Sequence, residues 1–169
     1  MATYIKIASN TVGSGGVASV TFSSIPSTYT DLVIKSSARS DRNTGNASDV
    51  KIEFNATATT YTIRALYGDG VTNVASASIA YVGSIPQATD TASTFGNQET
   101  YIPNYTSSNQ KSYSTDIVEE QNTGATPVYA FMSAGLWNGT SAISSIKLSL
   151  VSGNFVQYST FTLYGISNA

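Results

Sequence analysis

The sequence predicts an all-β protein, folded as an antiparallel, jelly-roll-like β-sandwich of about eight to ten strands with little or no helix. Three observations support this fold class. Apolar side chains alternate with polar ones in many short segments, sequences rich in Gly, Asn and Asp separate these segments, and no segment keeps a helical period with capping residues. The length of 169 residues suits one domain, so we expect residues 1–169 to form a single β-sandwich.

Each expected strand is supported by alternation or by a run of β-branched and aromatic residues. In one such segment Val50, Ile52 and Phe54 alternate with Lys51 and Glu53, which is typical of a sheet with one buried and one solvated face. The strands are expected at residues 3–8, 16–22, 30–39, 48–55, 59–67, 92–102, 111–120, 127–138, 143–151 and 158–167.

Two stretches are less regular than the others. Residues 1–16 contain the first expected strand, and they are also a candidate N-terminal arm that reaches a neighbouring subunit. Residues 71–90 are rich in Ala and Ser, and there we expect a short turn or helix. Just before them, Asp69 and Gly70 form the kind of two-residue sequence that favours a tight hairpin turn.

The segment at residues 127–138 is unusual because both of its faces are apolar. We favour a central strand that its own chain covers on both sides. The alternative is a strand whose second face is covered by another subunit. The two faces consist of Val128, Ala130, Met132 and Leu136 on one side, and of Tyr129, Phe131 and Trp137 on the other.

Two of the few charged residues stand at the two ends of the strand expected at residues 30–39. Asp31 and Arg39 are too far apart along that strand to pair with each other. We therefore expect structural roles for both. Asp31 should accept hydrogen bonds from backbone N–H groups, and Arg39 should pair with a carboxylate such as Glu53 or Glu99.

The composition excludes several classes of function. The chain has no cysteine and no histidine, so it lacks thiolate metal ligands and the commonest general base. Only 11% of the residues are charged and the net charge is −2, which leaves no basic patch for nucleic acid. The N-terminus does not read as a signal peptide, and no apolar run reaches the length of about 18 residues that spans a bilayer. We expect no cofactor, no metal, no nucleic-acid partner and no membrane partner.

The sequence also offers no clear catalytic group. A Ser-His-Asp relay is impossible without histidine. Pairs of carboxylates could meet from different strands, for example Asp69 with Glu99 or Asp116 with Glu119, but no spacing selects one pair. We therefore expect a protein that is not an enzyme and has no catalytic residue.

Tyrosine is the most informative residue type that remains, with 11 copies in the chain. Its ring can be buried while its hydroxyl keeps a polar partner, so core packing accounts for many of them. Tyrosine is also enriched at protein–protein contacts and can stack on sugar rings. We give subunit contact more weight than sugar binding, because no compact aromatic platform can be identified from the sequence.

Four motifs in a fixed order carry a resemblance to a known family. They are I-P-x-x-Y-x-D-L at residues 25–32, L-Y-G-D-G at residues 66–70, Y-I-P-N-Y at residues 101–105, and Y-S-T-x-T-L-Y-G-I at residues 158–166. With these motifs the chain resembles a β-rich virion protein of tailed bacteriophages, including cyanophages. The resemblance covers residues 20–167 and supplies no catalytic residue.

The resemblance implies a non-enzymatic virion protein made in the host cytoplasm. The length of the chain favours a head decoration, or cement, protein on the capsid surface. Such a protein binds the major capsid protein lattice, and it also binds other copies of itself to form a homotrimer. The alternative is a short tail-fibre or receptor-binding module that binds a host-surface glycan. The candidate subunit-contact residues are Tyr101, Tyr105, Tyr129, Phe131 and Trp137.

Overall fold

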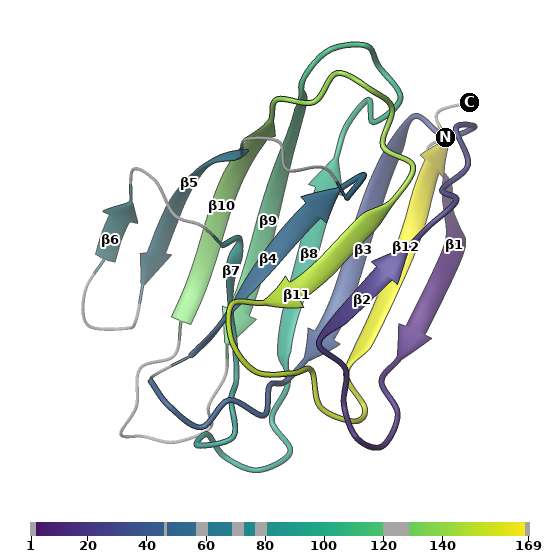
Figure 1. The fold of residues 1–169 in the computed structure, drawn as a ribbon. Helices are drawn as coiled ribbons and strands as arrows, with labels where there is room; N and C mark the ends of the chain where they lie inside the picture. The colour runs from purple at the N-terminus through teal and green to yellow at the C-terminus, as the bar shows by residue number, and fades with distance from the viewer. Residues whose placement is uncertain are drawn as a thin grey trace.

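The computed structural model describes residues 3–45, 47–56, 61–68, 73–76, 81–119 and 129–167 (Figure 1). These residues form 12 strands and no helix, which confirms the all-β prediction. The strands are β1 (Thr3–Thr11), β2 (Ser19–Phe22), β3 (Asp31–Ala38), β4 (Ser48–Phe54), β5 (Tyr61–Gly68), β6 (Asn73–Ser76), β7 (Gly83–Ile85), β8 (Gly96–Ile102), β9 (Lys111–Glu119), β10 (Tyr129–Trp137), β11 (Ile146–Leu150) and β12 (Thr160–Ser167).

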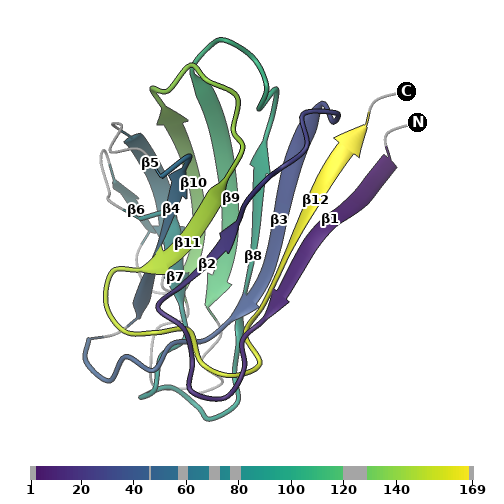
Figure 2. The same cartoon turned by 45° about the vertical axis from the view of Figure 1, so that its right-hand side comes forward.

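The strands form two layers. The larger sheet has eight strands in the order β1-β12-β3-β8-β9-β10-β5-β6, and the smaller sheet has four in the order β2-β11-β4-β7. Figures 1 and 2 show the smaller sheet lying over one face of the larger one. Every pairing between neighbouring strands is antiparallel. The antiparallel sandwich is therefore confirmed, while the narrower jelly-roll assignment stays a prediction.

The core lies between the two layers and is rich in aromatic side chains. Phe54 of the smaller sheet packs edge-on against Tyr113 and Trp137 of the larger sheet, with ring centroids 5.4 Å and 5.6 Å apart. Leu148 of β11 and Ile34 of β3 are fully buried in the same cluster. Because each such side chain contributes about 1.5–3 kcal/mol on burial, this layer supplies much of the folding free energy.

Two predictions about the strands were wrong. The number of strands exceeds the expected eight to ten, and residues 71–90 contribute β6 and β7 where a turn or helix was expected. These strands have four and three residues, too few for a period of two to stand out. β7 is specified instead by pairing, because Gly83 to Ile85 lie along β4. The turn predicted at Asp69 and Gly70 lies outside the described residues.

The N-terminal segment is an edge strand of the larger sheet. β1 pairs with β12 from Thr3 opposite Ser167 to Thr11 opposite Thr160, and the register shifts between Lys6 and Ala8. Such bulges are common at sheet edges. This pairing confirms the first strand expected within residues 1–16, while contact of this segment with a neighbouring subunit stays a prediction.

The two ends of β3 are fixed in different ways. Asp31 accepts a hydrogen bond from the Asn104 backbone N–H at 2.9 Å, which confirms the predicted role. The prediction for Arg39 was wrong, because its guanidinium donates to the backbone carbonyl oxygens of Asp90, Thr91 and Thr94. The two proposed carboxylate partners form ion pairs with lysines instead, Glu99 with Lys35 at 2.8 Å and Glu53 with Lys147 at 3.8 Å.

Candidate functional site

The outer face of the larger sheet, the face turned away from the smaller sheet, presents side chains that the chain itself does not cover. Strand β10 shows this clearly. Phe131 and Trp137 point into the core and are 4% and 1% exposed, whereas Met132 and Leu136 are 66% and 40% exposed. The favoured prediction that the chain covers both faces of this strand was therefore wrong.

Apolar side chains of β5 and β10 form one part of this face, which we call the outer apolar strip. Leu66, which is 60% exposed, lies directly opposite Met132 in the register of the two strands. Together with Ala134 they line a shallow depression of about 520 Å³. The strip consists of Leu66, Ala130, Met132, Ala134 and Leu136.

Charged residues border the outer apolar strip on both sides. Arg64 of β5 is the register partner of Ala134, and Asp116 of β9 is the register partner of Met132. Both side chains are exposed and line the same depression. The strip is thus an apolar surface with a cation along one border and an anion along the other.

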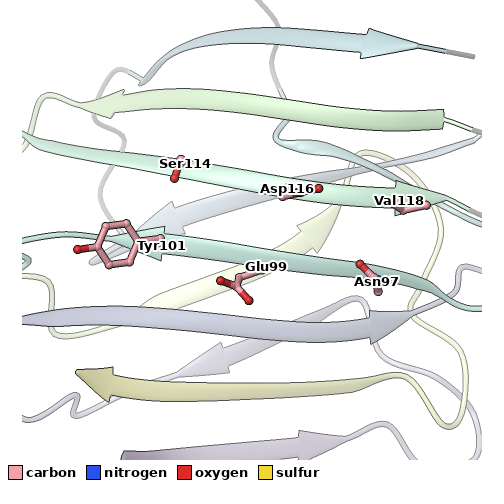
Figure 3. A pocket seen from close by; sticks show the side chains of 6 residues that line it. All are labelled: Asn97, Glu99, Tyr101, Ser114, Asp116 and Val118. Carbon is pink, nitrogen blue, oxygen red and sulfur yellow. The ribbon is translucent and has the colours of Figure 1, made fainter. Parts of the chain in front are cut away.

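A second depression, polar in character, lies beside the strip on β8 and β9 (Figure 3). Its volume is about 420 Å³. Glu99 and Asp116 stand directly opposite each other across the two strands. Glu99 is held by Lys35, whose pKa is raised by the hydrogen bond and the negative charge of Glu99. The residues that line this polar depression are Asn97, Glu99, Tyr101, Ser114, Asp116 and Val118.

Three tyrosines on the same face continue from the polar depression toward the sheet edge. Figure 3 shows the ring of Tyr101 at the end of the depression. The Tyr101 hydroxyl donates to Asp31 at 2.9 Å. The pKa of Tyr101 is raised mainly by burial and, to a smaller extent, by this hydrogen bond. Two strands further along, Tyr164 of β12 contacts Tyr4 of β1 edge-on, with ring centroids 6.2 Å apart. We call Tyr4, Tyr101 and Tyr164 the tyrosine group.

The structure buries some of the predicted subunit-contact residues and leaves others exposed. Tyr105, Phe131 and Trp137 are buried within the chain, so they retain almost no surface for a second subunit. The reason is that two apolar faces on one strand do not reveal which face is inside, and packing against Phe54 selects the face of Trp137. Only Tyr101, on the outer face, remains a well-exposed candidate.

The fifth candidate, Tyr129, is half-buried at another position. It borders a small depression of about 270 Å³ together with Tyr67, Tyr81 and Asp49. Burial raises the pKa of the Asp49 carboxyl, although the Ser84 hydroxyl donates to it at 2.8 Å. This cluster joins the side chains of the two layers and does not extend onto the outer face.

The described residues provide little for catalysis or metal binding. The suggested pair of Asp116 and Glu119 cannot form, since Asp116 is exposed on the outer face and Glu119 is fully buried. Asp69 of the other suggested pair is not among the described residues. Within the described ranges no three His, Cys, Asp or Glu residues gather as metal ligands. The same part of the chain contains no helix long and apolar enough to cross a membrane.

Comparison with known proteins gives no relative from which a function could be transferred. No protein-family model, no curated protein and no solved structure matches the chain. Function therefore has to be inferred from the outer face itself. Sequence reasoning did not find the tyrosine group, because Tyr4 and Tyr164 are brought together only by the pairing of the first and last strands.

Proposed function

We propose that this protein is a non-catalytic structural protein of a tailed-phage particle, a head decoration protein that binds the major capsid protein lattice. The outer apolar strip is the observation that carries the proposal. Leu66 and Met132 are both more than half exposed and lie side by side on β5 and β10, near one edge of the larger sheet. Contiguous apolar surface of this kind marks contact sites on soluble proteins. The family resemblance supplies the virion setting.

The strip is the contact between copies of this chain. Arg64 and Asp116 lie on opposite sides of β10, so a second copy that docks on the strip can place unlike charges opposite each other. A net charge of only −2 adds little repulsion between copies. The resemblance implies three copies in the assembled unit.

The physical mechanism is linkage between binding and shell stability. A protein that binds the assembled lattice but not the free capsid subunits lowers the free energy of the assembled state. Association of several copies multiplies this effect, because each further contact becomes intramolecular once the first has formed. No chemical step is needed.

The test measures self-association and head binding in the same variants. Met132→Lys and Leu66→Lys each place a charge in the strip, and Val151→Lys is the matched control at an exposed apolar residue outside it. We expect the wild type and the control to be oligomers by analytical ultracentrifugation and to co-sediment with phage heads. The two strip variants should be monomers that bind heads weakly.

The proposal is overturned by either of two results. One is a wild-type protein that stays monomeric at the concentrations of assembly and does not bind heads. The other is a strip variant that associates and binds as well as the control.

A further inference from the structure

The ring of Tyr101 is held in one position on the outer face. Its hydroxyl donates to one oxygen of Asp31, and the other oxygen of Asp31 accepts the backbone N–H of Asn104. Tyr101 as a whole remains 37% exposed, and Figure 3 shows its ring nearly face-on at the end of the polar depression. A ring that is fixed before a ligand arrives loses little conformational entropy when something stacks on it.

The polar depression beside the ring is rich in hydrogen-bond acceptors. The Glu99 and Asp116 carboxylates accept only, the Asn97 amide both donates and accepts, and the Ser114 hydroxyl does the same. Lys35 fixes the Glu99 carboxylate through an ion pair of 2.8 Å. Among the described residues, Asp116 has no ion-pair partner. The carboxylate oxygens therefore make acceptors more numerous than donors in the depression, and a ligand with several hydroxyl groups would supply the donors.

We propose that the polar depression and the tyrosine group together bind a neutral oligosaccharide. One sugar ring stacks on Tyr101, because the C–H face of a pyranose is apolar and suits an aromatic ring. Its hydroxyl groups donate to Glu99 and Asp116. The two carboxylates disfavour acidic sugars, since like charges repel at close range. This site goes beyond the proposed structural function and does not depend on it.

The tyrosine group gives the site a direction and a length. From β8 the path crosses β3 and β12 to reach β1, where Tyr4 is 53% exposed next to Tyr164. Three strand spacings correspond to about 14 Å. The site thus accommodates a chain of a few sugar rings that runs across the strands, with Tyr101 at one end and Tyr4 at the other.

The oligosaccharide site and the outer apolar strip can be tested separately. They adjoin at Ser114 and Asp116, but Tyr101 and Tyr4 lie on the far side of the polar depression from Met132. Variants of the two tyrosines should therefore leave self-association unchanged, and Leu66→Lys, which lies one strand further from Asp116 than Met132 does, should leave sugar binding unchanged.

The experiment is an NMR titration of the full chain with cellohexaose, maltohexaose and mannohexaose, and with an oligogalacturonate of similar length as the acidic comparison. We expect at least one neutral hexasaccharide to bind and to shift the signals of Tyr101 and Ser114. Tyr101→Ala should weaken binding about tenfold or more. Tyr101→Phe, which keeps the ring, should retain most of the affinity. Tyr158→Ala is the matched control, because Tyr158 is 69% exposed in the connection between β11 and β12.

Tyr4→Ala provides a second variant in case Tyr101→Ala perturbs the Asp31 contacts, and it should shorten the preferred oligosaccharide. The proposal is overturned if none of the neutral hexasaccharides binds at millimolar concentration. It is equally overturned if the folded Tyr101→Ala and Tyr4→Ala variants bind like the Tyr158→Ala control, or if the acidic oligosaccharide binds as well as the neutral ones.

Discussion

The inner and outer faces of strand β10 carry similar residues and have different roles. Phe131 and Trp137 on the inner face are buried against aromatic rings, while their sequence neighbours Met132 and Leu136 lie open on the outer face. The inner face contributes to folding, and the outer face is free for a second molecule. The comparison teaches that hydrophobicity alone does not assign a role; the position of the second layer does.

The largest expected effect is a loss of folding stability that differs between the inner and outer faces of β10. Trp137→Ala should lower the free energy of unfolding by about 3–5 kcal/mol, because it opens a cavity next to Phe54. Leu136→Ala, one residue earlier on the outer face, should change it by less than about 1 kcal/mol. Urea denaturation followed by circular dichroism measures both. Equal losses in the two variants would show that the faces are not distinct.

A smaller loss of stability is expected at Gly135, where the inner face of β10 has no room for a side chain. Gly135 of β10 lies under the ring of Tyr113, and a Cβ atom at this position would be 2.1 Å from Cζ of that ring. Gly135→Ala should therefore cost about 1–3 kcal/mol of stability through overpacking. Ala134→Ser on the outer face is the neighbouring control and should be nearly neutral. The same denaturation measurement applies, and an unchanged midpoint for Gly135→Ala would contradict the close packing.

The smallest effect belongs to the outer-face ion pair of Lys35 and Glu99, whose side chains are about half exposed. Lys35→Met should lower stability by less than about 1 kcal/mol, since solvent screens such pairs. Because Glu99 raises the pKa of Lys35 above 10.5, the contribution is fully present below that pH and is lost as the pH rises through the raised value. Thermal unfolding at pH 7 and at higher pH should show the difference between wild type and variant shrinking. A difference that grows with pH would contradict this assignment.

The sequence was sufficient for the fold class because alternation survives in the longer strands. Val50, Ile52 and Phe54 are buried as predicted, with Lys51 on the opposite face. The three residues of β7 were missed, since a strand that short is specified by its partner β4 and not by its own pattern.

The candidate site was harder to predict, because it depends on which strands are neighbours and on which of their residues lie opposite each other. The role of Asp31 follows from its place at the start of a strand, and it was predicted correctly. Arg39 was assigned a carboxylate, whereas a loop of the chain offers it backbone carbonyl groups, which no sequence pattern marks. The pairing of Glu99 with Asp116 requires knowing that β8 and β9 are neighbours.

The bulge in β1 bears on how copies of this chain can associate. An exposed sheet edge is normally a template on which further strands can be added, leading to open-ended fibres. The shift between Lys6 and Ala8 interrupts the regular row of backbone groups along this edge. Addition of strands at β1 is thereby discouraged, which blocks one route to open-ended growth in a weakly charged protein.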